Sequence, residues 1–122
     1  VLDIKGSDLL DAFNVMAQGR VTAVSRQADV VYTPALKSEN GNTPGRINSV
    51  KINGKPIDPD KTYRIATIDY LADGGDYMKP LTRATRVAKV GTDLAEDIIS
   101  YYREGKGRGK KVKPDSSNRF RP

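Results

Sequence analysis

The segment Ile47–Ile68 constrains the fold most, because two turn signals separate its three runs of strand-forming residues. The first run alternates apolar and polar residues and ends at Asn53-Gly54, which suits a two-residue hairpin turn because both central positions need a positive φ angle. The chain returns through Lys55–Ile57, and Asp58–Lys61 forms a second turn with proline at its second position. Thr62–Ile68 is β-branched and aromatic and predicts another strand. Strands this close together predict antiparallel pairing.

Two stretches with helical periodicity flank this region. Ser7 predicts the N-cap of a first helix with one apolar face, which ends at Gly19. A second helix is expected over Asp93–Arg103, after Gly91 and an N-cap at Thr92, with acidic residues early and a basic residue late, as the helix dipole favours. Strands are expected at Val1–Ile4, Val21–Val24, Ala28–Thr33 and Arg83–Val90, and a polar loop at Lys37–Gly45. This order predicts an α+β fold with a mixed, mainly antiparallel sheet and flanking helices.

Composition excludes several classes of function. The chain has 122 residues, enough for one domain with a modest core, and contains no cysteine and no histidine. Disulfides, thiolate metal sites and all Ser-His or Cys-His catalytic arrangements are therefore excluded. No apolar run has the length of a membrane span, and no stretch has the pattern of a signal peptide. We expect neither a catalytic residue nor a metal site in this chain.

The net charge of +6 belongs entirely to the C-terminal segment. From residue 103 onward only two acidic residues oppose eight basic ones, which are Arg103, Lys106, Arg108, Lys110, Lys111, Lys113, Arg119 and Arg121. This segment is either an arm that binds an anionic partner or a solvated terminus whose alternating glycines disfavour a helix. Aromatic residues do not alternate with the basic run as a nucleic-acid stacking surface requires, so nucleic acid is not the expected partner.

Three carboxylates, Asp69, Asp73 and Asp76, surround Gly74-Gly75 after the strand predicted at Thr62–Ile68. Either they hold a cation or a ligand hydroxyl through oxygen atoms, or Asp69 and Asp73 begin a tight turn whose exit Asp76 caps. The calcium-loop pattern and the common glycine-rich phosphate-loop patterns are absent. Tyr70, beside the turn, either stacks on a planar ligand or packs in the core or at its rim.

Most of the chain resembles the C-terminal domain of the 5′-nucleotidases and UDP-sugar hydrolases. Val50–Thr67 is similar to the family's run that ends in Lys-Thr-Tyr-Arg-Val-Ala-Thr. Asp69–Asp76 is similar to the family's Asn, aromatic, Leu-Ala, any residue, Gly-Gly-Asp, and Tyr63–Asp76 is the specific part of the likeness. Asp3–Phe13, the last predicted helix and Asn118–Phe120 also resemble family segments. On this resemblance we expect a domain that is incomplete at its N-terminal side.

The resemblance implies a division of labour between two domains. In this family an N-terminal metallophosphatase domain holds two divalent metals and hydrolyses the phosphoester, while the C-terminal domain binds the nucleoside. There the base lies between two aromatic residues, and an aspartate binds ribose hydroxyls. Tyr70 matches one of these aromatics and Asp76 matches the ribose ligand, while Gly74 and Gly75 would let the backbone approach the ligand. With Asp69, these residues are the expected substrate-binding set.

Two positions depart from the family pattern. Asp69 stands where the family usually has asparagine, and Tyr77 stands where it has glycine, which would stiffen or reshape the loop. The second stacking aromatic and a ligand arginine belong to family motifs that precede Val1. The expected domain covers residues 1–104, followed by a basic, glycine-rich tail over 105–122 with a final strand expected at 117–121.

The function implied by the resemblance is nucleoside or nucleotide binding for a 5′-nucleotidase-like phosphoesterase. Hydrolysis would need the two-metal domain, in the same precursor or as a separate chain, and the family's usual location is periplasmic or at the cell surface. Two alternatives come from the residues themselves. One is a non-catalytic interaction domain whose basic tail binds an anionic partner, and the other is an autonomous enzyme that uses the carboxylates of Asp69–Asp76.

Overall fold

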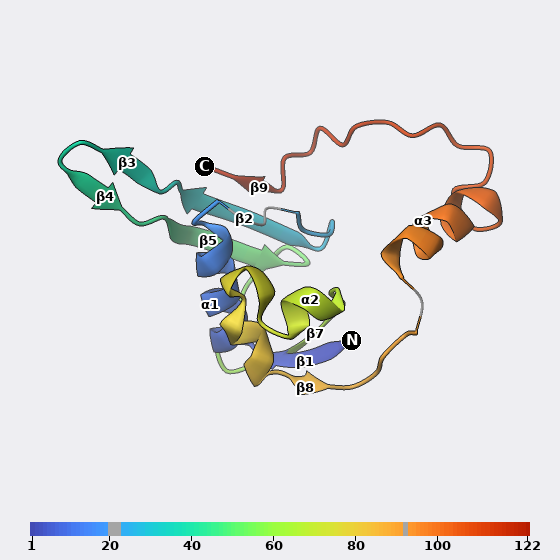
Figure 1. Cartoon of the computed structure of the whole chain (residues 1–122), viewed down its shortest axis with the longest axis horizontal. Helices are drawn as coiled ribbons and strands as arrows, with labels where there is room; N and C mark the ends of the chain where they lie inside the picture. Colours follow the sequence, from blue (N-terminus) through green and yellow to red (C-terminus); the bar gives the residue numbers. More distant parts are fainter. Residues whose placement is uncertain (20–22, 92) are drawn as a thin grey trace.

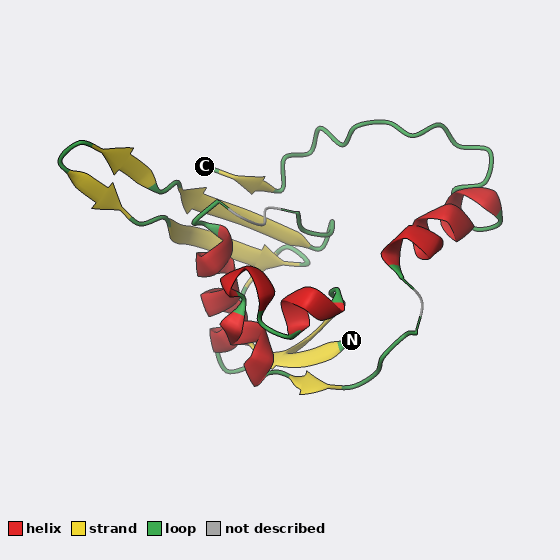
Figure 2. Cartoon of the chain, in the orientation of Figure 1, coloured by secondary structure: helices red, strands yellow, loops and turns green. Residues whose placement is uncertain are grey.

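The computed structural model describes residues 1–19, 23–91 and 93–122 and confirms the α+β class (Figures 1 and 2). In chain order the elements are β1 (Leu2–Lys5), α1 (Gly6–Met16), β2 (Ala28–Thr33), β3 (Leu36–Ser38), β4 (Gly41–Thr43), β5 (Arg46–Ile52), β6 (Lys55–Pro56), β7 (Thr62–Ile65), α2 (Asp69–Ala72), η1 (Gly75–Tyr77), η2 (Lys79–Arg83), β8 (Thr85–Arg86), α3 (Leu94–Arg103) and β9 (Phe120–Arg121).

The described strands form three sheets. The first has the order β7-β1-β8 and is antiparallel, and the second has the order β6-β5-β2-β9. In the second sheet only β9 runs parallel to its neighbour, β2. The third is the small hairpin of β3 and β4. The prediction of mixed but mainly antiparallel pairing is therefore confirmed.

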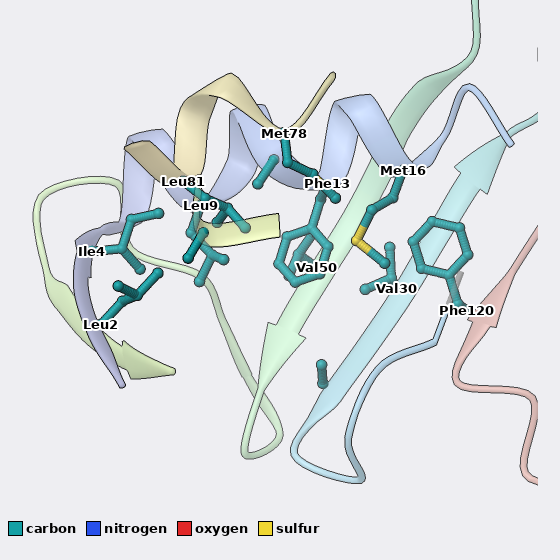
Figure 3. Packing of buried hydrophobic residues seen from close by; sticks show 13 residues of the cluster. Leu2, Ile4, Leu9, Phe13, Met16, Val30, Val50, Met78, Leu81 and Phe120 are labelled. Atoms are coloured by element: carbon teal, nitrogen blue, oxygen red, sulfur yellow. The ribbon is translucent and has the colours of Figure 1, made fainter. Parts of the chain in front are cut away.

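Helix α1 packs against both larger sheets and carries much of the core. Leu9, Phe13 and Met16 follow one another at helical spacing and are all buried. Figure 3 shows Phe13 beside Val50 of β5 and Met16 beside Val30 of β2. The apolar face predicted for this helix is thus the face that holds the sheets together.

The start of α1 differs from its prediction. The helix begins at Gly6, and no side chain caps it, so Ser7 is not the N-cap. Instead the amide of Gly6 donates to the carbonyl of Lys61 at 2.7 Å, and that of Ser7 donates to Pro59 at 2.9 Å. A Cβ on Gly6 would lie 1.9 Å from the carbonyl oxygen of Asp58, so only glycine permits this approach. The predicted turn at residues 58–61 therefore replaces the side-chain cap.

The hairpin at Asn53-Gly54 forms as predicted. Both residues have positive φ, 51° and 78°, and Ile52 pairs with Lys55 across the turn. The strand predicted at Thr62–Ile68 ends earlier, at Ile65, because its partner β1 begins at Leu2, which lies opposite Ile65.

The strand predicted at Arg83–Val90 is reduced to Thr85 and Arg86. Within this segment only these two residues pair with β1, and Arg83 instead ends η2, where its guanidinium forms ion pairs with Asp8 and Asp11 of α1. These two contacts hold η2 against the helix.

Two further predictions fail in the first half of the chain. Lys37–Gly45 contains the hairpin of β3 and β4 rather than only a loop, with a turn at Glu39 and Asn40 and a positive φ at Gly41. All residues of this hairpin are exposed, so it lacks the alternating apolar pattern that identifies a strand. In the strand predicted at Val21–Val24, residues 21 and 22 lie outside the described part, and Ala23 and Val24 are not in a strand.

The second helix, α3, is confirmed, but its surroundings are unexpected. Asp93 caps it by accepting a hydrogen bond from the amide of Glu96 at 2.8 Å, whereas the cap predicted at Thr92 lies outside the described residues. Every residue of α3 is exposed, and Figure 1 shows the helix (orange) standing off from the sheets. The chain then returns to the body, where β9 pairs with β2 and Arg121 forms an ion pair with Asp29.

Candidate functional site

The acidic turn after β7 is built as a short helix followed by a left-handed corner. Asp69 begins α2, where the amide of Asp73 donates to the carbonyl of Asp69 at 2.9 Å. The amide of Gly74 then donates to Leu71 at 3.0 Å, and Gly74 has a φ of 92°. Only glycine adopts this conformation readily. The chain therefore reverses at the point where the sequence places Gly74-Gly75.

The second glycine brings Tyr70 against the corner. A Cβ on Gly75 would lie 2.5 Å from the Cε2 and Cζ atoms of Tyr70 and 2.6 Å from its carbonyl oxygen. Such distances are far inside van der Waals contact, so the ring lies where a side chain at residue 75 would be. Gly75 thus leaves the space that the Tyr70 ring occupies.

Tyr70 and Asp76 come together across this glycine. The Tyr70 hydroxyl lies 3.5 Å from the Oδ1 atom of Asp76, at the long limit of a hydrogen bond. The Tyr70 side chain remains 58% exposed, and Asp76 is half-buried. An exposed aromatic ring and a carboxylate therefore face solvent side by side, and such a pair can stack a planar group and accept hydrogen bonds from hydroxyls.

The backbone at this site is strained. Asp76 has φ 51° and ψ 38°, and Tyr77 has φ 63°, so two consecutive non-glycine residues occupy the left-handed region. This region is unfavourable for residues with a Cβ, and such residues are concentrated at functional sites. Tyr77, which replaces a glycine of the family pattern, thus keeps the left-handed conformation that glycine would adopt easily.

The other two carboxylates do not join Asp76. Asp73 forms an ion pair with Arg86 of β8, and Asp69 lies 3.9 Å from the ammonium of Lys89. Within residues 1–19, 23–91 and 93–122, no group of three Asp, Glu, His or Cys side chains could hold a metal ion. The cation-site interpretation of the three carboxylates therefore has no support in this geometry.

Sequence reasoning missed Arg86 and Lys89 as neighbours of the site. They follow Asp76, the last residue of the acidic turn, by 10 and 13 residues, and they reach the turn because β8 pairs with β1 beside β7. In the sequence, basic residues recur every three positions at 83, 86 and 89. This spacing is the one available signal, but it does not indicate which carboxylates Arg86 and Lys89 approach. Only the sheet order supplies that information.

The site rests directly on the core. Ala72 precedes Gly74-Gly75 and Met78 and Leu81 follow it, and all three are buried in the main hydrophobic cluster. The amide of Met78 donates to Gly75 at 3.0 Å and closes the corner. The exposed pair of Tyr70 and Asp76 is therefore held on a packed support rather than on a free loop.

Comparison with known proteins now decides the family. A family model described as 5′-nucleotidase, C-terminal domain, matches residues 1–83, which include the whole acidic turn. The chain belongs to this family. Protein UshA of Escherichia coli (strain K12) is 30% identical over 104 residues, which are 84% of this chain and 18% of that protein. Protein UshA of Yersinia enterocolitica is 36% identical over 99 residues, which are 81% of this chain and 17% of that protein.

The chain spans less than a fifth of the length of these relatives. The family match ends at residue 83, so it includes α1, the hairpin and the site but neither α3 nor the basic tail. The predicted domain boundary at residue 104 stays a prediction.

Proposed function

We propose that this chain is the nucleoside- or nucleotide-binding C-terminal domain of a 5′-nucleotidase-like phosphoesterase. The observation that carries the proposal is the position of Tyr70 beside Asp76. The Tyr70 hydroxyl lies 3.5 Å from the Oδ1 atom of Asp76, across Gly75. Both residues lie in the part of the chain that matches the family. Nucleosides offer the two groups that such a pair recognises, a flat base and vicinal hydroxyls.

Each residue of the predicted set has a distinct role in this proposal. The base stacks on the exposed Tyr70 ring, and the ribose hydroxyls donate hydrogen bonds to the Asp76 carboxylate. Gly74 and Gly75 shape the corner that carries this pair, since Gly74 has a φ of 92° and Gly75 leaves room for the Tyr70 ring. Asp69 lies at the start of α2, where its exposed carboxylate can accept a further hydrogen bond from the ligand beside its 3.9 Å contact with Lys89.

Hydrolysis belongs to another domain in this proposal. The carboxylates of the described residues do not converge as a two-metal site requires, so the divalent metals would be held by a metallophosphatase domain, in the same precursor or as a separate partner. This chain binds and orients the nucleoside part of the substrate. We further propose a periplasmic or cell-surface location, as is usual for the family.

No helix within the described ranges is long and apolar enough to cross a membrane.

The experiment is a titration of the folded chain with adenosine and with AMP, followed by amide NMR. We expect shifts centred on residues 69–77. Base stacking contributes about 1–3 kcal/mol, so Tyr70→Ala should weaken binding roughly 5- to 150-fold. Tyr101→Ala, which removes another exposed tyrosine, serves as the matched control and should bind as the unmodified chain does. Unchanged affinity in a folded Tyr70→Ala chain would refute the proposal.

One observation keeps a second function in view. The five basic residues from Lys106 to Lys113 are exposed, and none of them forms an ion pair with another described residue. In contrast, Arg119 pairs with Asp115 and Arg121 pairs with Asp29. Such a run suits a non-catalytic domain that binds an anionic partner through its tail. Binding to a heparin column that weakens with salt and is lost on deletion of residues 105–113 would support it.

A further inference from the structure

Helix α3 has an apolar stripe without a buried contact. Leu94, Ile98 and Tyr102 follow one another four residues apart and so share one face, and Ile99 widens it. Leu94 is 59% exposed, and Ile98 and Ile99 are each 51% exposed. The polar residues Glu96 and Ser100 lie on the opposite side. A helix with this pattern is normally packed against an apolar surface.

The body of the molecule has an apolar surface of matching character. A cavity of about 620 Å³ lies between α1, β7 and the start of the second sheet. Its lining includes Phe13, Ile52, Tyr63, Ile65, Leu71 and Met78. Exposed residues such as Asn53 and Ala66 also line it, so the cavity reaches the surface. The core is therefore open on this side.

The linker that precedes α3, residues 87–93, is short enough to keep the helix near this cavity. Val87 and Ala88 are held to the chain start, since the amide of Val87 donates to the carbonyl of Val1 and the Val1 ammonium donates to Ala88. Leu2 lies opposite Ile65 on one side and Arg86 on the other. Val87 and Ala88 are thus separated from Ile65, which lines the cavity, by two strand spacings, or about 10 Å.

The remaining linker covers that distance. Residues 89–93 span at most about 17 Å when extended, which exceeds the separation of about 10 Å. On the other side, residues 104–119 connect α3 to β9 and can extend over about 50 Å, so they impose no restraint. Figure 1 shows α3 on the side of the molecule where the chain begins and β2 starts.

We propose that α3 closes over this cavity as an intramolecular cover, with Leu94, Ile98 and Ile99 seated on its apolar lining. The proposal goes beyond nucleoside binding, since it assigns a packing function to a segment outside the family match. Closure also places α3 beneath the candidate site, because Leu71 and Met78 line the cavity on the side of the acidic turn. The closed form then has α3 beneath the acidic turn as a support, and the open form lacks this support.

Disulfide trapping tests the closure directly, since the natural chain contains no cysteine. Ile98→Cys combined with Ala66→Cys joins the apolar face of α3 to the exposed mouth of the cavity. Ser100→Cys combined with Ala66→Cys is the matched control, since Ser100 points away from that face. We expect rapid cross-linking within one chain for the first pair and at least tenfold slower cross-linking for the second.

Three outcomes would overturn the proposal. Equal rates for both pairs would mean that α3 moves freely on its tethers, and no cross-link in either pair would mean that it packs elsewhere. Cross-linked dimers without the intramolecular product would mean that a second copy supplies the cover. None of these outcomes depends on nucleoside, so the proposed function is tested separately.

A stability measurement provides the second readout. Ile98→Asp should lower the urea midpoint of unfolding, because it places a charge against the apolar lining, whereas Ser100→Asp should leave the midpoint unchanged. Equal midpoints for the two variants would contradict closure even if the cross-link forms.

Discussion

Helices α1 and α3 have nearly the same length, 11 and 10 residues, and each has one apolar stripe, yet only α1 buries its stripe. Helix α1 follows β1 without a linker, and its first amides bond to the turn at residues 58–61. Helix α3 is separated from β8 by residues 87–93. Amphipathic periodicity therefore identifies the face of a helix that needs a partner, and the connection to the next element decides how firmly that partner is fixed.

The largest expected difference between the helices concerns Phe13, which is 6% exposed in the centre of the core. Phe13→Ala should lower the free energy of unfolding by about 3–5 kcal/mol through lost burial and a residual cavity. Ser100→Ala, on the polar side of α3, should change it by less than about 0.5 kcal/mol. Urea unfolding followed by circular dichroism measures both. A loss below about 1 kcal/mol for Phe13→Ala would show that α1 is no better fixed than α3.

The backbone attachment of α1 gives the next largest effect. Gly6→Ala forces a Cβ toward the Asp58 carbonyl, so the turn must move away and the amides of Gly6 and Ser7 lose their partners. Each buried amide left without a partner costs about 1–3 kcal/mol. Ser7→Ala is the matched control and should cost little, because the Ser7 hydroxyl does not cap the helix. A loss for Ser7→Ala as large as that for Gly6→Ala would contradict this account.

The cap of α3 should matter less. Asp93→Ala removes the acceptor for the Glu96 amide and should cost about 0.5–2 kcal/mol of helix stability. Because α3 is joined to the body by linkers, the loss should appear as faster amide exchange within residues 94–103 while α1 is unaffected. Equal changes in both helices would mean that they unfold as one unit.

The smallest effect concerns the return of the chain at β9. The Arg121 guanidinium, through its hydrogen bond to Asp29, holds the pKa of that carboxyl below its usual value of 3.8. A lowered carboxyl pKa stabilises the folded chain above the unfolded-state pKa, and this contribution is lost as the pH falls through the folded-state value. The protection factor of the Val30 amide, which donates to Arg119 just before β9, should therefore fall below that range. Asp29→Asn should remove this fall, and its persistence would assign the effect to another group.

Local chemistry made much of this fold predictable. The hairpin at Asn53-Gly54, the face of α1 and the extent of α3 follow from rules that involve residues close together in the sequence. The predictions that failed depend on distant partners. Ser7 is not a cap because the turn at residues 58–61 supplies the acceptors, and the strand after Arg83 is short because only Leu2 and Asp3 of β1 pair with it.

The candidate site divides in the same way. The sequence identified Tyr70, Gly74, Gly75 and Asp76 together, because a single turn brings them together. It did not identify Arg86 or Lys89, which lie near Asp73 and Asp69 only through the order of strands in the first sheet. Charge patterns along a chain do not specify which opposite charges meet across a sheet.

The pairing of β9 with β2 has a consequence for the behaviour of α3. It fastens the far end of the segment that begins at Val87, so residues 87–119 form a loop pinned to the body at both ends. A helix confined in this way has an effective concentration near the cavity on the order of millimolar. An apolar contact too weak to hold two separate molecules together would then suffice to keep α3 in place, and a modest weakening of that contact would release it.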